Sequence, residues 1–393
     1  MKNPWSLIKA FWNGNTPIYV HFGLTHRCNL TCAMCGLWKK GRQDEELTIA
    51  QIEATAENLR NLGTMAVSLG GGEPFLRPDL PQIVKAFTSR GIETRVLTNA
   101  LVGSEELHLK VAQAGLRHIS ISLDTPHPQV QSEICHKPEI WAKIIERVRF
   151  WSDIIRKRGG TAILNCVVSA RNINDIPQML EIAKAYNFYL SLVPLEKHSY
   201  QGEILTCSAD SEAMRFTEAD EAALDKLLQY LLQVKQQPRS PIFNSVPYLK
   251  AMVNFLKDSH KKNQSPQNSA QMTANYWGTD TDCQTGSLSF SISPNGTYSM
   301  CHFQNDTPAE SPQVYESNFV DWYRQERNLE HIKKIRSHCR ACLRPCWWEI
   351  ALTLHTSSAF FNALRMNFRR FAAKPLPSPS ELANEIKKVS PLC

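Results

Sequence analysis

The sequence predicts an α/β protein built on a parallel sheet, and two observations support this. Between residues 18 and 195, short runs rich in β-branched and aromatic residues alternate with amphipathic stretches of helical length. The connections between them are short, and strand–helix–strand repetition of this kind implies parallel strands joined by right-handed crossovers. Six such units can form either an open sheet or an incomplete barrel, and both bind ligands at the carboxyl ends of their strands.

The individual elements follow from local signals. The predicted strands are Tyr19–Leu24, Met65–Leu69, Glu93–Thr98, His118–Leu123, Ala162–Ser169 and Tyr189–Pro194. The predicted helices are Thr48–Asn61, Leu80–Arg90, Glu105–Ala114, Ile140–Arg158, Ile176–Tyr186, Glu218–Gln233 and Val246–Leu256. Thr48 and Gln51 have the spacing of a capping box at a helix start. Gly63, Gly91 and Gly115 each precede a strand, where a helix commonly ends in a left-handed glycine.

Composition narrows the functional classes. With 393 residues, 42% hydrophobic and 21% charged, the chain is typical of a globular protein. It has no apolar run long enough to span a bilayer, and the N-terminal residues lack the apolar core of a signal peptide, so we expect a cytoplasmic protein. The net charge of +7 is modest. It favours a solvated basic face over an anionic substrate or a membrane surface, and we expect no nucleic-acid partner.

Twelve cysteines in a reducing compartment indicate metal binding or catalysis rather than disulfides. Eight of them fall in two groups. The four scattered cysteines are expected to act only as small buried hydrophobes, and they are Cys135, Cys166, Cys207 and Cys393.

The first cysteine group follows the first predicted strand directly. Cys28, Cys32 and Cys35 have C-x3-C-x2-C spacing, and a loop leaving a strand can bring three thiolates around one cluster. Iron–sulfur cubes usually take four cysteine ligands, so three leave one iron open. An open coordination position is typical of a catalytic metal. The alternatives are a zinc site with His26 as fourth ligand, and thiols grouped by chance.

Further polar residues and glycines follow the next three predicted strands. Gly70-Gly71-Gly72-Glu73-Pro74 comes at the end of the second strand, where glycines let the backbone approach a ligand. Asn99 follows the third strand, and Ser122 and Asp124 end the fourth. Polar side chains on apolar barrel strands point into the interior or over its mouth, and they need partners when buried.

These motifs together resemble the radical S-adenosylmethionine (SAM) enzymes. The resemblance rests on the cysteine spacing, Met34 before the last cysteine, the Arg-Cys-Asn lead-in and the Gly-Gly-Glu-Pro sequence. It implies a partial (β/α)6 TIM-type barrel over residues 18–195 and a [4Fe-4S] cluster on the three cysteines, whose free iron chelates the methionine moiety of SAM. It also implies that Gly71, Gly72 and Glu73 hold the SAM ammonium group. Ser122 and Asp124 would lie at the SAM ribose, with Asn99 beside them.

The second cysteine group consists of Cys283, Cys301, Cys339, Cys342 and Cys346. Alternating residues around Pro294-Asn295-Gly296 predict a β-hairpin that brings the first two thiols together at its base. By itself the group also fits a structural zinc ribbon. After a radical SAM core it resembles the SPASM domain and its shorter form, twitch. Five thiols cannot fill eight positions for two cubes, so one auxiliary [4Fe-4S] cluster is expected, and spacing does not decide which of the last three cysteines is left out.

The resemblance thus implies an enzyme that cleaves SAM reductively to a 5′-deoxyadenosyl radical and abstracts a hydrogen atom from a small metabolite or a peptide. An electron donor such as flavodoxin or ferredoxin would be its partner. The expected divisions are an N-terminal extension (1–17), the radical SAM core (18–195), a helical connection with a polar loop (196–275), the auxiliary-cluster domain (276–350) and an amphipathic tail (351–393). Two alternatives remain: a lipid-modifying enzyme held at a membrane surface by that tail, and a non-catalytic zinc-binding module.

Overall fold

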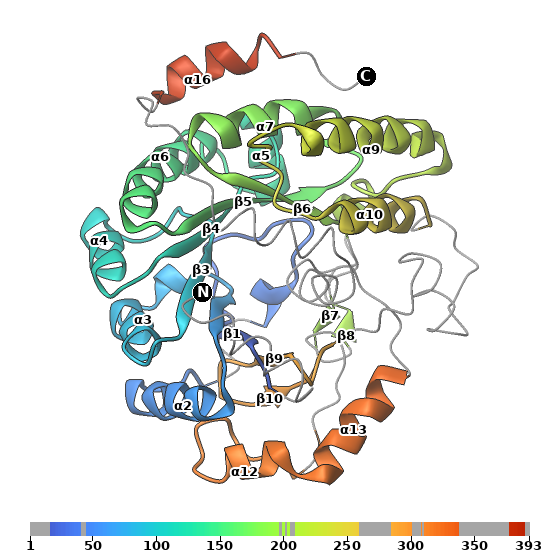
Figure 1. Ribbon diagram of the computed structural model, residues 1–393. Coiled ribbons are helices and arrows are strands. Elements are labelled where there is room, and N and C mark those ends of the chain that lie inside the picture. The colour runs from blue at the N-terminus through green and yellow to red at the C-terminus, as the bar shows by residue number, and fades with distance from the viewer. Residues whose placement is uncertain are drawn as a thin grey trace.

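A curved sheet of eight strands forms the centre of the protein in the computed structural model (Figure 1). The structure describes residues 16–40, 45–195, 199–200, 203–204, 209–258, 284–300, 308, 310–337 and 377–389. The strand order is β10-β9-β1-β2-β3-β4-β5-β6. The bounds are β1 Tyr19–Thr25, β2 Ala66–Gly71, β3 Glu93–Thr98, β4 His118–Ser122, β5 Thr161–Val168, β6 Tyr189–Pro194, β9 Ser289–Ile292 and β10 Tyr298–Ser299. Strands β1 to β6 are parallel neighbours in chain order, which confirms the α/β class and the partial barrel.

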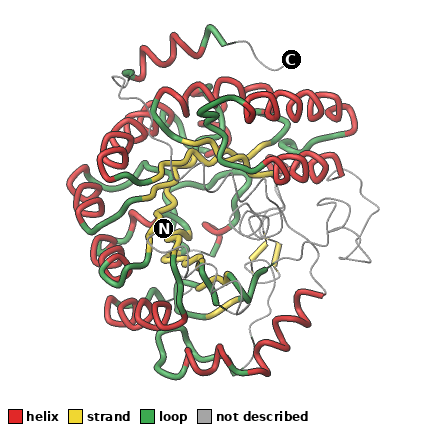
Figure 2. Tube along the Cα trace, in the orientation of Figure 1, coloured by secondary structure: helices red, strands yellow, loops and turns green. Residues whose placement is uncertain are grey.

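Helices cover the convex outer side of this sheet, so that strands form the inner layer and helices the outer one (Figure 2). Those of the barrel are α2 Ile49–Leu62, α3 Leu80–Thr88, α4 Glu105–Gln113, α5 Pro128–Cys135, α6 Trp141–Arg158 and α7 Ile176–Ala185. The later helices are α8 Ala209–Glu212, α9 Glu221–Gln236, α10 Val246–Asp258, α12 Phe319–Arg324, α13 Glu326–Ser337 and α16 Pro379–Ile386. A separate two-stranded sheet pairs β7 Ser199–Tyr200 with β8 Glu203–Ile204.

The local signals in the sequence are confirmed where the structure can be compared with them. The seven predicted helices are present within three residues of their expected bounds, whereas α5, α8, α12 and α13 were not predicted. Thr48 and Gln51 form the expected capping box at the start of α2. Gly63, Gly91 and Gly115 all have positive φ, as expected for glycines that end helices.

The two faces of the sheet differ in polarity. On β1, Val20, Phe22 and Leu24 are fully buried on the outer side, where the Phe22 ring meets Phe87 of α3 edge to face. The alternate residues face inward, because successive side chains of a strand point to opposite faces. The outer side therefore supplies the apolar core that joins sheet and helices.

Both edges of the six-stranded unit are covered. On one side β9 pairs in parallel with β1, matching Tyr19 with Ser289 and Phe22 with Ile292. On the other side the segment 241–244 lies along β6: the Leu190 N–H donates to the Pro241 carbonyl at 2.8 Å, and the Leu192 N–H donates to Asn244 Oδ1 at 2.7 Å. Covered edges are not open to pairing with another chain.

The predicted hairpin is present as β9 and β10, which pair antiparallel and extend the barrel sheet itself. Its outer side packs an aromatic cluster against α12, formed by Phe290, Tyr298, Phe319, Trp322 and Tyr323. The Tyr323 hydroxyl donates to the Gly286 carbonyl at 2.6 Å. The C-terminal half is therefore joined to the barrel through β1.

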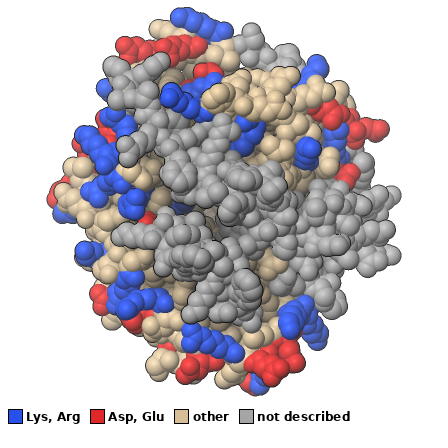
Figure 3. Space-filling view, viewed as in Figure 1, with Lys and Arg blue, Asp and Glu red and all other residues tan. Residues whose placement is uncertain are grey.

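The described surface carries charges of both signs around the rim of the face in Figure 3. Within the described residues, no helix has the length and apolar character needed to cross a membrane. The apolar and basic helix expected from Trp347 towards Phe371, on which the membrane-surface alternative rests, lies outside the described residues.

A polar network fixes the amino ends of β3 and β4. Glu93 accepts from Arg117 Nη1 at 3.1 Å, and its other oxygen lies 3.3 Å from His118 Nε2. The Thr161 N–H donates to His118 Nδ1, so the ring proton sits on Nε2 and points at Glu93. Burial lowers the pKa of His118 despite Glu93, so the ring is a neutral donor at pH 7. The hydrogen bond from His118 and the charge of Arg117 hold the pKa of Glu93 at about 2.

Replacing Glu93 by Gln is expected to lower the free energy of unfolding at pH 7 by about 1 kcal/mol, since the carboxylate is partly exposed and its interactions are screened. The folded-state pKa is depressed, so this contribution is present above the ordinary pKa of 4.5 and is lost as the pH falls towards 2. Denaturant unfolding of both chains between pH 7 and pH 3 measures it. Glu106→Gln, which alters an exposed ion pair with Lys110, is the control and should leave stability unchanged. A Glu93→Gln deficit that does not shrink below pH 4.5 contradicts the assignment.

Candidate active site

The three predicted cluster cysteines lie on the loop that leaves the carboxyl end of β1. Cys28, Cys32 and Cys35 are all partly buried. The Cys35 N–H closes a turn onto the Cys32 carbonyl at 3.1 Å, and Trp38 Nε1 donates to the Cys35 carbonyl at 2.7 Å. A negative charge on Cys35 would raise the pKa of both other thiols, so the three lie within electrostatic reach of one another. The loop therefore brings together the residues that the spacing predicted.

The environment of these thiols raises the pKa of two of them. Burial raises the pKa of Cys28 to about 11, and the neighbouring Cys135 thiol together with burial raises that of Cys32, so both are neutral thiols until a metal binds. Among the described residues, no three His, Cys, Asp or Glu side chains converge closely enough to hold one ion. A [4Fe-4S] cube takes one thiolate on each iron, so its ligands stand farther apart.

The Gly-Gly-Glu turn after β2 packs backbone to backbone against this loop. The Gly72 N–H donates to the Thr25 carbonyl at 2.7 Å, and the Glu73 N–H donates to the Arg27 carbonyl at 2.8 Å. A Cβ atom on Gly72 would lie 2.0 Å from the Arg27 carbonyl oxygen, and one on Gly71 would lie 2.3 Å from that of Thr25. Only glycine permits this approach at both positions, and Gly71 also has a φ of +115°.

Glu73 has a completely buried carboxylate that joins β2 to β3. It accepts from the Phe75 N–H at 3.1 Å, from the Thr98 hydroxyl at 2.7 Å and from the Asn99 N–H at 2.8 Å. Burial raises its pKa to about 7, against the effect of these hydrogen bonds. The Glu73 side chain therefore binds other parts of the protein and holds the turn in place. The SAM contact predicted for residues 71–73 is a contact of their backbone.

Asn99 connects the end of β3 to the cysteine loop. Its amide Nδ2 donates to Asn29 Oδ1 at 2.8 Å and lies 3.9 Å from Cys28 Sγ. Its Oδ1 accepts from the Leu101 N–H at 3.0 Å, which fixes the orientation of the amide. The structure thus places Asn99 beside the first cysteine of the motif.

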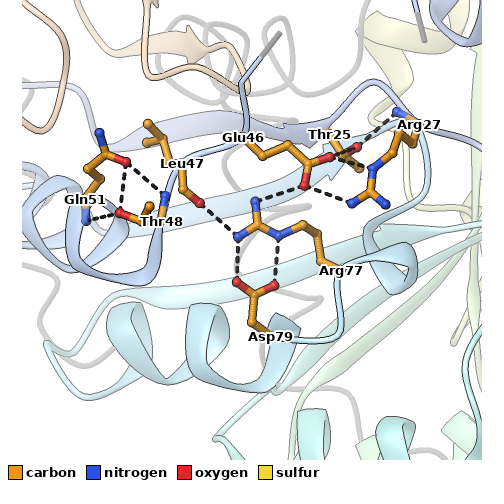
Figure 4. A network of polar contacts seen from close by, with 8 residues as sticks. All are labelled: Thr25, Arg27, Glu46, Leu47, Thr48, Gln51, Arg77 and Asp79. Carbon is orange, nitrogen blue, oxygen red and sulfur yellow. Dashed lines mark hydrogen bonds and ion pairs between the residues drawn. The ribbon is translucent and has the colours of Figure 1, made fainter. Parts of the chain in front are cut away.

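A carboxylate and two arginines hold the two ends of the cysteine loop together (Figure 4). Glu46 accepts from the Thr25 hydroxyl at 2.5 Å and from Arg27 Nε at 2.7 Å, and Arg77 Nη1 lies 3.4 Å from its second oxygen. Arg77 also donates to Asp79 and to the Leu47 carbonyl. Burial alone would raise the pKa of Glu46, but the hydrogen bonds from Arg27 and Thr25 outweigh it and lower that pKa. We call this set the Glu46 clamp.

Ser122 and Asp124 lie at the carboxyl end of β4 but in different settings. Ser122 is exposed and pairs in register with Asn165 of β5. Asp124 is buried, and its Oδ1 accepts from the Val167 N–H at 2.9 Å. Burial raises the pKa of Asp124 to about 6. Asp124 thus joins β4 to β5, and the contact of both residues with SAM stays a prediction.

Some predicted site residues lie outside the part of the chain that the structure describes, and some contacts of the cysteine loop were not predicted from the sequence. All five cysteines of the second group lie outside the described residues. The sequence analysis missed Glu46 and Arg77, and it missed the hydrogen bond at 2.9 Å from the Ala33 N–H to the Ile134 carbonyl, which joins the cysteine loop to α5. These are contacts between distant parts of the chain, and no spacing or periodicity in the sequence signals them.

Replacing Gly72 by Ala is expected to push the cysteine loop away from the turn, because its Cβ would overlap the Arg27 carbonyl. We expect a loss of about 2–4 kcal/mol in the free energy of unfolding and reduced iron binding. Denaturant unfolding of the cluster-free chain and iron analysis after anaerobic reconstitution measure both. Gly23→Ala is the control, since its Cβ would meet nothing closer than 3.5 Å. If Gly72→Ala kept the stability and iron content of the parent, the close contact between the turn and the cysteine loop would not be required.

Replacing Glu46 by Gln removes the charge between the two arginines while keeping the shape of the side chain. We expect a loss of about 1–2 kcal/mol in the free energy of unfolding, because Arg77 stays buried with less compensation. The loop ends are then held less firmly, so proteolysis near the cysteines should be faster in the cluster-free chain. Glu57→Gln, an exposed partner of Arg60 and Arg90, is the control. Equal proteolysis of the Glu46 variant and its parent would argue against a clamp.

Part of the chain matches known proteins in sequence. Residues 23–183 match the sequence model described as Radical SAM superfamily. The chain is 28% identical over 168 residues to the PqqA peptide cyclase of Xanthomonas campestris pv. campestris (strain B100), a match that covers 42% of this chain and 44% of that relative. The same values hold for the enzyme of strain 8004. The chain thus spans less than half the length of these curated relatives.

Solved structures share the fold at low sequence identity. Streptococcus suis SuiB bound to S-adenosylmethionine has a TM-score of 0.58 at 16% identity, covering 85% of this chain and 71% of that one. The protein anSMEcpe, with bound AdoMet and the Kp18Cys peptide, has a TM-score of 0.56 at 14% identity, covering 84% and 87%. Residues 23–183 thus match the Radical SAM superfamily in sequence, and the chain shares its fold with these solved structures. The matches support an enzyme over the non-catalytic zinc-binding alternative.

Proposed function

We propose that the protein cleaves SAM reductively to a 5′-deoxyadenosyl radical and abstracts a hydrogen atom from its substrate. One observation carries the proposal: the loop with Cys28, Cys32 and Cys35 is held by backbone hydrogen bonds against the Gly72–Glu73 turn. The donor set suits a [4Fe-4S] cluster with one iron open, and the matched family supports the same assignment. When bound, cluster and SAM supply the radical chemistry.

The protein's own residues then bind, orient and shield. The three thiolates hold the cluster, and the Glu46 clamp fixes the loop that carries them. The carbonyl oxygens of residues 71–73 can accept from the SAM ammonium group, because the N–H groups of Gly72 and Glu73 are used by the loop. Ser122, exposed at the end of β4, would contact the SAM ribose, and Asp124 holds the neighbouring β5 through the Val167 N–H. Asn99 fixes the Cys28 side of the site.

For the substrate we propose a peptide rather than a small metabolite. The curated relatives are named peptide cyclases. Among the solved structures of this fold, SuiB was determined with the precursor peptide SuiA, and anSMEcpe with a peptide. Those ligands belong to those proteins, and they support the same substrate class here. An electron donor of the flavodoxin or ferredoxin type would reduce the cluster.

We further propose one auxiliary [4Fe-4S] cluster, held by Cys283, Cys301 and two of Cys339, Cys342 and Cys346. Two described residues beside the first pair support it: the hydroxyl of Thr285, two positions after Cys283, donates at 2.5 Å to the carbonyl of Met300, which precedes Cys301. Both belong to the base of the hairpin, at the amino ends of β1 and β9.

The proposal predicts about eight iron and eight sulfide per chain in anaerobically reconstituted protein, from two cubes. Dithionite-reduced protein with SAM should release 5′-deoxyadenosine, measured by chromatography and mass spectrometry. Cys32→Ala should abolish the release, since the cube loses one of three ligands, whereas the control Cys166→Ala should keep it. Release by Cys32→Ala at the parental rate would refute the site, and zinc without sulfide would refute the proposed function.

A further inference from the structure

Asn99 is the first residue after β3, and its backbone is fixed by the Gly-Gly-Glu turn. Its N–H donates to Glu73 Oε2 at 2.8 Å, and the other oxygen of this buried carboxylate accepts from the Thr98 hydroxyl at 2.7 Å. The next residue, Ala100, is 1% exposed and has a φ of +63°, a conformation that residues other than glycine rarely adopt. Such strain persists only where the surrounding structure enforces it, and it is common at functional sites. The fold therefore holds Asn99 in one place although this strains Ala100.

The side-chain amide of Asn99 also has a fixed orientation. Its Oδ1 accepts from the Leu101 N–H at 3.0 Å, and its Nδ2 donates to Asn29 Oδ1 at 2.8 Å. A flipped amide would turn Nδ2, which is a donor, towards the Leu101 N–H, which is also a donor. The Leu101 N–H thus decides the orientation, and Nδ2 faces the cysteine loop.

The same nitrogen atom reaches the first cysteine of that loop. An amide nitrogen carries two N–H groups, and Asn29 accepts from one of them. The structure has a second hydrogen bond from Asn99 Nδ2, to Cys28 Sγ, at 3.9 Å. A neutral thiol is a weak acceptor, whereas a cysteine that coordinates iron is a thiolate. Hydrogen bonds to charged acceptors are shorter and stronger, so we expect this one to tighten when a cluster is bound.

We propose that Asn99 is a positioning residue that donates an N–H···S hydrogen bond to the Cys28 thiolate and so raises the reduction potential of the SAM-binding cluster. A donor at a ligand sulfur offsets the negative charge that the cluster gains on reduction, and such hydrogen bonds are among the determinants of iron–sulfur potentials. The role rests on the proposed function, because it needs a cluster on Cys28, Cys32 and Cys35. It gives Asn99 a task towards the cluster, in addition to its expected place beside the SAM ribose.

The first test is a redox titration of the full-length, anaerobically reconstituted protein, following the cluster whose EPR signal changes when SAM is added. Asn99→Ala removes the N–H donor and should lower the midpoint potential. Asn99→Asp keeps the shape of the side chain but places a carboxylate oxygen where the N–H group was, so it should lower the potential further.

Asn29→Ala is the matched control. Both Asn29→Ala and Asn99→Ala remove the hydrogen bond between the two amides, but only Asn99→Ala also removes the N–H that faces Cys28. The potential of Asn29→Ala should therefore stay close to that of the parent. An equal fall in both variants would mean that loop packing sets the potential, and it would overturn the proposal. A parental potential in Asn99→Ala would overturn it as well.

A second experiment tests the contact without any cluster. Asn29→Ala, Asn99→Ala and the double variant are unfolded with denaturant as cluster-free, full-length chains. The losses of the two single variants should not add, because each removes the same hydrogen bond. Additive losses would show that Asn99 does not reach the cysteine loop, which overturns the proposal. If the losses are non-additive but the parental chain holds no SAM-responsive cluster, the contact stands and it is the proposed function that fails.

Discussion

The site depends first on the backbone contact between the carboxyl ends of β1 and β2. The N–H groups of Gly72 and Glu73 donate to the carbonyls of Thr25 and Arg27, immediately before the first cysteine of the loop. Parallel strands bring their carboxyl ends to one edge of a sheet. A side chain at position 72 would nevertheless overlap the Arg27 carbonyl oxygen and push the two turns apart. Glycine at that position therefore decides whether the cysteine loop and the Gly-Gly-Glu turn form one site.

Two carboxylates support this contact, and their surroundings give them different protonation behaviour. Glu73 has only neutral donors around it, so burial dominates and its pKa rises to about 7. Glu46 lies between Arg27 and Arg77, so its pKa falls although it too is partly buried. The raised pKa of Glu73 suits a side chain that joins strands β2 and β3 by hydrogen bonds. The lowered pKa of Glu46 suits a charged clamp. The two carboxylates differ because arginines contact Glu46 and none contacts Glu73 among the partners named above.

The sequence predicted what is local and missed what joins distant segments. Strands β3 and β6 have the predicted bounds, because alternation and flanking turns are written within a few residues of each other. Helix α5 was missed because it has only eight residues and ends at His136, whose positive φ is one that glycine usually supplies. Three contacts join residues far apart in sequence: the pairing of β9 with β1, the Glu46 clamp, and the hydrogen bond from the Ala33 N–H to the Ile134 carbonyl. Their partners are set by the barrel, so only the folded structure identifies them.

The inner face of the sheet carries polar side chains. In register, His21 of β1 lies between Ser68 of β2 and Ser291 of β9, and Arg95 of β3 donates to Ser120 of β4 at 3.1 Å. Buried polar groups cost stability unless they find partners, so a sheet that needed only to fold would carry apolar side chains on this face as it does on the other. A polar inner face between the cysteine loop at one end and the hairpin base at the other suits a ligand rich in hydrogen-bonding groups, such as a peptide backbone. The same strands that position the cluster loop therefore also form this polar face.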